Sequence, residues 1–397
     1  MIKLQLFGAP ANWGGQLNTN EVFSPIYNMI ISQYVFADNI KGTKSSLVDA
    51  ARVDGSLYGD TKLYYDTDVL KSVTWGQDSE AANLLALHRP TAPKCQALTL
   101  DVFRQISLTV DDYLTKRAFA TPNAFSEFNS VMMGWIRNTK KVYDSTTYNT
   151  FIGTHETAEG NQTIEIDVAG ARGNASTEEE ANRLEAQAIA QRVAKLITDL
   201  EDVTRDYNDY GYLRSYVADD FRYVWNTDWV EKITKLDLPT IFHKDIMDKF
   251  GEYTLPARYF GTENVATGLA ADLVADGSTI RSLIEQDITL PDTSVVHVFA
   301  GDLIPSGVTV IDISEASPIV YPSYTQSNDI ICKVVHKDAV PYMSAFEVGT
   351  SFFNAKSLTT NHYLTFGHNT LEHLHGKPFI TLKAKAVEVV DDNDGQE

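Results

Sequence analysis

The segment 61–109 constrains the fold of this chain more than any other feature, because it reads as one long extended excursion. Short strand-like pieces such as KLYYDT and VFRQISLTV are separated by polar and proline-containing stretches, with one short helix predicted at 79–87. A connection of this length without a core of its own is uncommon inside a compact domain. We therefore expect something outside the subunit to support it.

The extended segment carries five basic residues in a chain that is acidic as a whole. The 53 acidic and 33 basic residues give a formal net charge of −20. This charge opposes a protein that grips nucleic acid over a broad surface, because phosphate neutralisation requires Lys and Arg. We expect the basic side chains of the segment to be subunit-interface residues that dock on an acidic face of an adjacent subunit. The alternative is that they solvate an exposed strand edge. These residues are Lys62, Lys71, Arg89, Lys94 and Arg104.

A long helix is predicted directly after this segment, over residues 121–144. Thr121 suits the N-cap and Pro122 the first helical position. Apolar side chains then recur on one broad stripe that includes Trp135, Ile136 and Tyr143. We expect this stripe, with Trp135 in it, to pack in the core of the subunit.

The middle of the chain alternates strands and helices. A strand at 163–168 and a Gly/Asn turn at 170–174 precede a second long helix that Ser176 caps. A strand at 221–226 leads into a short helix at about 229–235, and strands follow over 289–341. Together with the first helix, this order predicts an α+β fold, and the acidic tail at 391–397 is expected to be disordered.

Four histidines near the end of the chain are the strongest candidates for chemistry: His362, His368, His373 and His375. Imidazoles at i and i+2 on a strand share a face and can bind one metal ion. Apart from Glu372, however, no carboxylate or cysteine ligand stands at a matching spacing. Surface histidines are the commoner explanation, so we expect no metal site here.

Other chemical signatures are missing from the sequence. We find no phosphate-binding loop, no nucleophile elbow and no metalloprotease motif. Cys95 and Cys332 lie far apart, which indicates neither a disulfide scaffold nor a zinc ribbon. The sequence also shows neither a secretory signal nor a membrane-spanning stretch. We therefore expect no catalytic residues, no cofactor and no enzymatic activity.

The order of these elements resembles the major capsid proteins of tailed phages with the Hong Kong ninety-seven type of fold. The extended segment is similar to that of small short-tailed phages of Gram-positive hosts in YYDT (64–67), LALHRPTAPK (85–94) and the strand 105–109. FRYVWNTDWVEKI (221–233) resembles the strand and helix of the axial domain. The resemblance implies an N-terminal arm (1–60), an extended β-hairpin loop (61–110), a spine helix with the first part of the peripheral domain (111–149), a central axial α/β domain (150–348), and a peripheral-domain return with the acidic tail (349–397).

The same resemblance implies a function and partners. It implies a structural protein that self-assembles as hexamers and pentamers into an icosahedral head, and so belongs to the virion, after assembly in the host cytoplasm. The head would enclose double-stranded DNA without sequence-specific binding, and no membrane would be involved. A separate scaffolding protein is expected because the part before the loop is short, and a portal is expected as well. The alternatives are another ring-forming virion component, such as a portal or tail protein, or a metal enzyme that uses the cluster from His362 to His375.

Overall fold

The computed structural model describes residues 46–54, 61–72, 89–111, 122–157, 162–173, 175–234, 253–264, 279–308 and 321–385. The helix expected at 79–87 lies outside these residues. The chain divides into two compact units whose segments alternate along the sequence. The first unit comprises Met1–Asp60, Thr99–Thr146 and Tyr342–Thr370, and the second comprises Thr61–Leu98, Thr147–Pro341 and Leu371–Glu397. Within the described ranges, the structure contains no helix that is long and apolar enough to cross a membrane.

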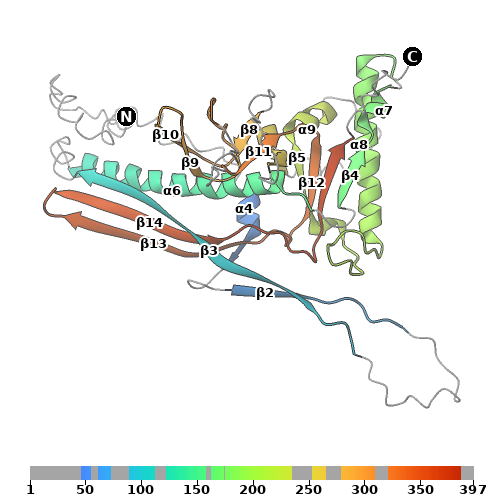
Figure 1. The fold of residues 1–397 in the computed structure, drawn as a ribbon, viewed down its shortest axis with the longest axis horizontal. Helices are drawn as coiled ribbons and strands as arrows, with labels where there is room; N and C mark the ends of the chain where they lie inside the picture. The colour runs from blue at the N-terminus through green and yellow to red at the C-terminus, as the bar shows by residue number, and fades with distance from the viewer. Residues whose placement is uncertain are drawn as a thin grey trace. The chain divides into compact units, whose positions relative to one another are not determined.

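The first unit contains long antiparallel strands (Figure 1). β13 (Tyr342–Asn354) and β14 (Thr359–Asn369) form a hairpin, and β14 also pairs with β3 (Lys94–Asp111). β1 (Arg52–Asp54), which follows the short helix α4 (Ser46–Ala51), pairs in parallel with β13. The sheet has the strand order β1-β13-β14-β3-β2, and its last strand β2 (Thr61–Asp66) belongs to the second unit, as does β3 up to Leu98.

β3 shows why this sequence forms so long a strand. Its side chains alternate, so that one face is buried or half-buried, with Leu98, Leu100, Leu108 and Val110 fully buried, while the other face is exposed. A period of two residues is what a strand with one packed face requires. The other face carries polar residues and Phe103, and its side chains are exposed in the part of the chain that the structure describes.

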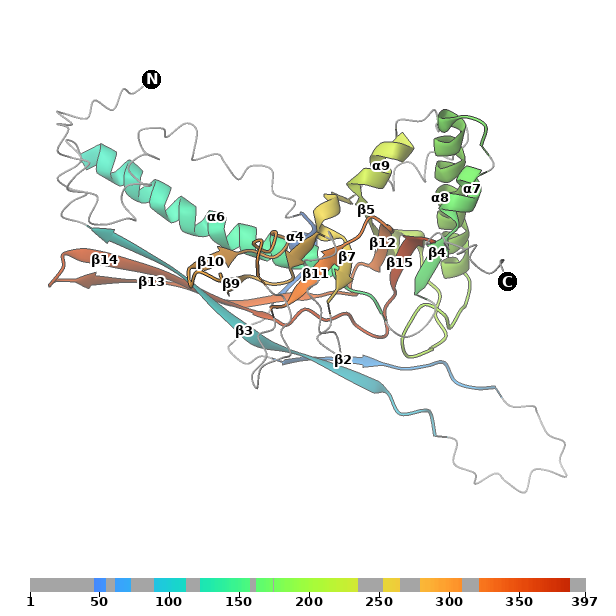
Figure 2. The ribbon, with the colours of Figure 1, turned by 45° about the horizontal axis from the view of Figure 1, so that its top comes forward.

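The helix α6 (Pro122–Thr154) starts at the expected proline and runs along the strands β3, β13 and β14 in both ribbon views (Figures 1 and 2). It continues well past the predicted end at 144, and its 33 residues make it about 50 Å long at roughly 1.5 Å per residue. The segment 145–150 is rich in polar side chains. In the structure the hydroxyls of Thr146 and Thr154 donate to carbonyls of Val142 and Thr150 in the same helix, so their polarity is satisfied.

The expectation that Trp135 lies in the core is wrong. Its side chain is 40% exposed, whereas the neighbouring Ile136 is 7% exposed. Successive helical residues point about 100° apart, so the two side chains cannot both centre on one face. Ile136 and Tyr143 lie seven residues apart and share the buried face, which leaves Trp135 at its edge.

A buried carboxylate connects α6 to the strands of the first unit. Asp144 is 2% exposed and accepts a hydrogen bond from the Tyr342 hydroxyl at 2.8 Å. Its other oxygen pairs with Arg52 at 2.9 Å and with Lys140 at 3.0 Å. Every oxygen of this desolvated charge therefore has a partner, as a buried ion requires.

The second unit is built around a five-stranded sheet of order β4-β15-β12-β5-β6. β12 (Ile330–His336) pairs antiparallel with β15 (Phe379–Ala384) and with β5 (Phe221–Asn226). The outer strands β4 (Thr163–Ile166) and β6 (Tyr253–Leu255) pair in parallel. The strands predicted at 163–168 and 221–226 are therefore confirmed, the first with a slightly earlier end.

The helix α8 (Glu178–Glu201) supplies the main apolar layer against this sheet (Figure 2). Ile189, Val193, Leu196 and Leu200 recur at helical spacing and pack in one cluster with Trp225 of β5. The cap of α8 is Thr177 rather than the predicted Ser176, because the Thr177 hydroxyl accepts from the Glu180 amide at 3.3 Å.

The predicted turn at 170–174 is also corrected, since α7 (Val168–Gly173) forms there. The Asp167 carboxylate accepts from the Gly170 amide at 2.8 Å and so caps this helix in spite of its glycines. The short helix after β5 is α9 (Thr227–Thr234). The remaining described elements are the 3₁₀ turns Ala218–Asp220 and Ala257–Tyr259, the sheet of β7 (Gly261–Glu263), β11 (Ser323–Gln326) and β8 (Ile280–Ser282), and the pair β9 (Gln286–Thr289) and β10 (Val295–Val298).

Lys333 is a fully buried lysine in the central strand β12. Its ammonium donates to the His155 carbonyl at 2.8 Å and to the Thr381 hydroxyl at 2.9 Å. Burial lowers the pKa of Lys333 to about 7, against the opposing attraction of Glu156. The neutral amine is therefore substantially populated near neutral pH.

Candidate assembly surface

β2 and the residues after it expose large apolar side chains. Leu63 and Tyr65 lie on the exposed face of β2, and Val69 and Leu70 follow it, with Leu70 78% exposed. Monomeric proteins rarely expose a row of large apolar side chains along an extended strand. This row is the first part of the candidate assembly surface.

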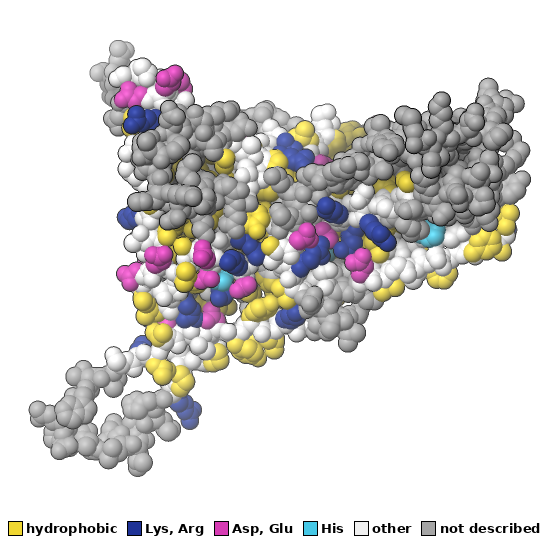
Figure 3. All heavy atoms as spheres, turned by 180° about the vertical axis from the view of Figure 1, so that it is seen from behind, with side chains coloured by type: hydrophobic (Ala, Val, Ile, Leu, Met, Phe, Trp, Pro, Cys, Tyr) yellow, Lys and Arg dark blue, Asp and Glu magenta, His cyan; other side chains and the backbone are white. Residues whose placement is uncertain are grey.

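The free end of the β13–β14 hairpin is the second part. Residues 347–358 are all exposed, and the neighbouring side chains Phe352 and Phe353 are 65% and 59% exposed. Successive residues of a strand point to opposite faces, so each face of the hairpin end presents an aromatic ring. Figure 3 shows this apolar surface at the right-hand end of the molecule. Exposed aromatic side chains of this size are typical of protein–protein contacts.

The five basic residues lie along β2, β3 and the segments that continue these strands. Lys71 and Arg89 are exposed, while Lys62 is half-buried. The Lys94 ammonium lies 4.5 Å from the Tyr210 ring centroid, and the half-buried Arg104 guanidinium lies 5.6 Å from that of Tyr143. Lys94 and Arg104 thus contact aromatic rings of their own subunit.

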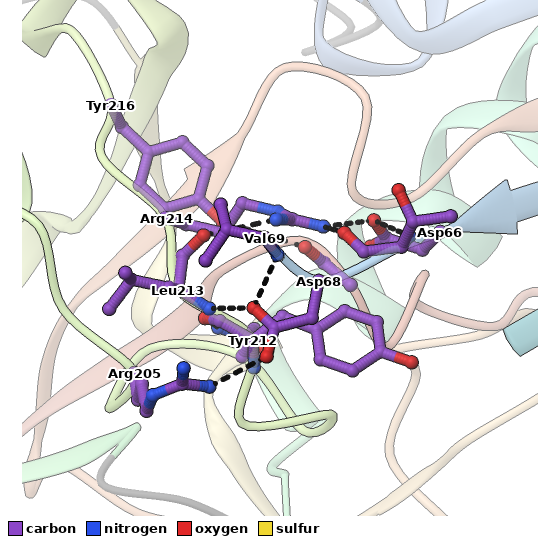
Figure 4. A network of polar contacts seen from close by, with 11 residues as sticks. Asp66, Asp68, Val69, Arg205, Tyr212, Leu213, Arg214 and Tyr216 are labelled. Atoms are coloured by element: carbon purple, nitrogen blue, oxygen red, sulfur yellow. Dashed lines mark hydrogen bonds and ion pairs between the residues drawn. The ribbon is translucent and has the colours of Figure 1, made fainter. Parts of the chain in front are cut away.

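At its base, the extended pair of strands is fastened to the loop 204–214 of the second unit (Figure 4). The Arg214 guanidinium pairs with Asp66 and donates to the Thr67 carbonyl at 2.6 Å. Asp68 accepts from the Leu213 amide at 3.0 Å and pairs with Arg205 at 3.0 Å. We call this group, formed by Asp66 and Asp68 with Arg205, Leu213 and Arg214, the loop anchor.

The electrostatics of the loop anchor favour the charged form of the Asp68 carboxylate. The backbone hydrogen bond from Leu213 and then the side-chain bond from Arg205 lower the pKa of Asp68 to about 2. Asp68 is therefore ionised at neutral pH. Its partners, Arg205 and the Leu213 amide, lie more than a hundred residues further along the chain. The spacing of residues in the sequence therefore could not predict these contacts.

β3 is also held by hydrogen bonds near the base of the extended pair. The Gln96 amide donates to the His373 carbonyl at 3.0 Å, and the His375 amide donates to the Gln96 side-chain oxygen at 3.1 Å. These bonds tie β3 to the segment 371–377. Both strands of the extended pair are therefore held at the base, whereas the apolar side chains of Val69 and Leu70, which follow the loop anchor, are exposed.

The structure separates the four histidines that the sequence grouped. His362 lies on β14, and His368 is buried, with the Tyr143 hydroxyl 2.6 Å from its Nε2 and the Asn369 carbonyl 2.8 Å from its Nδ1. Burial lowers the pKa of His368, so its ring is neutral. His373 and His375 instead meet at Asp209, a carboxylate 164 residues from His373 that sequence reasoning missed.

The comparisons with known proteins agree with this architecture. The family model described as Phi29-like phage major capsid protein matches residues 6–371. A chain in the capsid structure of Staphylococcus phage Andhra is 9% identical, with a TM-score of 0.54 over 85% of this chain and 83% of that one. A chain in the structure of the head fiber and inner core protein gp22 of native bacteriophage P68 is also 9% identical, with a TM-score of 0.55 over 85% and 84%. Among curated protein sequences there is no significant match. The α+β capsid fold expected from the order of elements is thus confirmed.

Proposed function

Because this chain belongs to the Phi29-like phage major capsid protein family, it is a structural protein of a phage head, and we propose that its exposed strands join it to neighbouring copies in the shell. The observation that carries this proposal is the contrast between adjacent residues of the segment that follows β2. The loop anchor holds Asp68, while Val69 and Leu70 directly beyond the anchor are exposed. Such an element gains its stabilisation from contacts that a single subunit cannot supply.

Apolar burial is the main source of free energy in this proposal. Covering about 100 Å² of apolar surface contributes about 2.5 kcal/mol at roughly 25 cal/mol per Å². Phe352, Phe353 and Leu70 each have enough exposed surface for a contribution of this order. A closed shell repeats each contact at every equivalent interface, so modest contacts add up to a stable assembly.

Charge is the second source, and it concerns the five basic residues of the extended segment. We assign Lys62, Lys71, Arg89, Lys94 and Arg104 to contacts with acidic faces of adjacent subunits, which the net charge of −20 makes abundant. Single exposed ion pairs contribute only about 0–1 kcal/mol and are screened by salt. Assembly should therefore be sensitive to salt without depending on any one pair.

Lys71 and Arg89 provide the cleaner test, because Lys94 and Arg104 also contact rings of their own subunit. The double variant Lys71→Glu/Arg89→Glu should give fewer shells than the parent at low salt, as measured by sedimentation. Arg183→Glu/Lys195→Glu makes the same charge change on exposed positions of α8 and serves as the matched control. Equal shell yields for the two double variants at low salt would overturn the assignment.

The remaining partners follow from the role of a head protein. We propose a separate scaffolding protein, a portal, and double-stranded DNA as the enclosed content, with the subunits arranged as hexamers and pentamers. A net charge of −20 supports enclosure without adhesion, because acidic surface and phosphate repel each other. Co-expression with a candidate scaffold should raise the fraction of closed particles in electron micrographs, and an unchanged fraction would contradict the scaffold assignment.

The domain assignment is part of the same proposal. We propose residues 1–60 as the arm, 61–110 as the extended loop, 111–149 as the spine part of the peripheral domain, 150–348 as the axial domain and 349–397 as the peripheral-domain return with the tail. The length of α6 supports its role as the spine. The family and the fold support a structural, non-enzymatic role for the whole chain.

A further inference from the structure

We propose that Asp209, His373 and His375 form a binding site for a divalent transition-metal ion of the zinc type. One carboxylate oxygen of Asp209, Oδ2, lies 2.7 Å from His373 Nε2 and 2.7 Å from His375 Nδ1. Among the described residues, this is the group whose His and carboxylate ligand atoms gather closely enough to hold an ion, all within 4.8 Å of one another. The inference does not depend on the proposed function.

The backbone already fixes the ligands relative to one another. The Asp209 amide donates to the His375 carbonyl at 2.9 Å, which joins the two segments that carry the ligands. The Gln162 amide donates to Asp209 Oδ1 and so turns Oδ2 towards the imidazoles. His373 and His375 are two residues apart, and the turn that carries His375 is closed by the Lys377 amide, which donates to the Leu374 carbonyl at 2.8 Å. A site positioned in this way loses little entropy when an ion binds.

The burial of the three proposed ligands suits a metal site that is open to solvent on one side. The side chains of Asp209 and His373 are 8% and 7% exposed, whereas that of His375 is 46% exposed. The two buried ligands provide a desolvated environment that strengthens their attraction for a cation. The exposed edge at His375 gives the ion a path of entry and leaves a coordination position for water.

The hydrogen bonds around His373 are compatible with both the metal-free and the metal-bound site. His155 Nε2 lies 2.8 Å from His373 Nδ1. Without an ion, His155 can donate to Nδ1 while His373 Nε2 donates to Asp209. With an ion on Nε2, the proton of His373 lies on Nδ1 and the bond to His155 reverses its direction. Metal-bound imidazoles are commonly oriented by a hydrogen bond of this kind at the other ring nitrogen.

The donor set selects the class of ion. Two imidazole nitrogens and one carboxylate oxygen suit Zn²⁺ and its neighbours such as Co²⁺ and Ni²⁺. Ca²⁺ and Mg²⁺ prefer sets made of oxygen donors. A bound ion would tie the 204–214 loop to the 371–377 segment, and these two segments hold the base of the β2–β3 pair.

The test uses full-length protein without a histidine tag, stripped with EDTA and titrated with Co²⁺ and Zn²⁺. We expect a visible Co²⁺ absorption band typical of four or five ligands, its loss on addition of Zn²⁺, and about one Zn²⁺ per chain by elemental analysis. Asp209→Asn and His375→Gln should each lose the band. His375→Gln changes a half-exposed side chain, so its folding is expected to be intact, and circular dichroism checks this for both variants.

His297→Ala is the matched control. Its ring also contacts two carboxylates, Asp287 at 2.7 Å from Nδ1 and Glu285 at 2.9 Å from Nε2. These carboxylates lie at opposite ring nitrogens and cannot converge on one ion, so this variant should keep the Co²⁺ band. The proposal is overturned if the parent binds no stoichiometric Co²⁺ or Zn²⁺, or if a folded His375→Gln variant binds as well as the parent.

Discussion

The Asp68 carboxylate accepts a hydrogen bond from the Leu213 amide at 3.0 Å, and the exposed side chains of Val69 and Leu70 follow immediately in the chain. Within two residues, the chain thus changes from a part that is hydrogen-bonded to its own subunit to a part with exposed apolar side chains. This change locates where the support of the subunit ends and where contacts with other copies are expected to begin.

We expect Asp68→Asn to loosen the residues after β2 while the fold is kept. The variant loses the charge that pairs with Arg205, but the side chain can still accept from Leu213. Limited proteolysis should therefore cut residues 67–72 faster than in the parent. Asp292→Asn is the control, because Asp292 bonds only locally to Ser294 in the described contacts. The expectation fails if Asp68→Asn and Asp292→Asn are cut at the same rate.

Acid should open the loop anchor in a defined direction. The pKa of Asp68 is lowered to about 2 in the folded chain, from an ordinary value of 3.8. Its contribution is therefore fully present above pH 4 and is lost as the pH falls towards 2. Proteolysis of 67–72 by an acid-active protease should accelerate over this range in the parent. Asp68→Asn should show a weaker dependence on pH, and parallel curves would contradict the assignment.

Phe352→Ser and Phe353→Ser should impair assembly with little effect on the subunit. Both side chains are more than half exposed, so the free energy of unfolding should change by only about 0.5 kcal/mol. Val295→Ser alters an equally exposed apolar side chain on β10 and should leave shell yield unchanged. Normal shell yields for both phenylalanine variants would remove the hairpin end from the assembly surface.

Neighbouring positions on α6 should differ sharply in their effect on stability. Ile136→Ala removes a buried side chain and should lower the free energy of unfolding by about 2–5 kcal/mol. Trp135→Ala removes a larger but 40% exposed side chain, and we expect a smaller loss. Urea denaturation of the two variants measures the difference. A larger loss for Trp135→Ala would show that the face assigned to α6 is wrong.

The buried lysine predicts a pH dependence of the same sign as that of Asp68, but in a higher pH range. The pKa of Lys333 is lowered to about 7 in the folded chain, from 10.5. Between these values the unfolded chain binds more protons, so this group makes the free energy of unfolding rise with pH. Lys333→Met lacks this component. From pH 7 to about 9.5 the parent should therefore gain stability relative to the variant, in denaturant titrations that fit a two-state transition. A constant difference between the two proteins would contradict the lowered pKa.

Local patterns predicted the elements whose causes are local. The proline at 122 marked the start of α6, and the run FRYVWN formed β5 as expected, since both depend on nearby residues. The end of α6 was missed because threonine hydroxyls bond within the helix and Tyr148 donates to the Val340 carbonyl from far along the chain. Periodicity alone also could not decide which side of the stripe Trp135 occupies.

The residues of the candidate sites were harder to predict from the sequence than the helices and strands. The basic residues of the extended segment could be read from the sequence, but Arg205 and Arg214, which fasten it, follow no motif. The pair His373 and His375 was visible by its spacing, whereas Asp209 was not, because folding brings it from 164 residues away. Ligands contributed by distant segments become apparent only when the strand order is known.

An electron cryomicroscopy reconstruction of the assembled shell would show which surfaces join the subunits. We predict that the exposed side chains of β2, the residues 69–72 and the hairpin end 347–358 lie against neighbouring subunits, while the loop anchor between Asp68 and Leu213 is intact within each subunit. A shell in which these strands face solvent, or in which other surfaces alone join the subunits, would contradict this prediction.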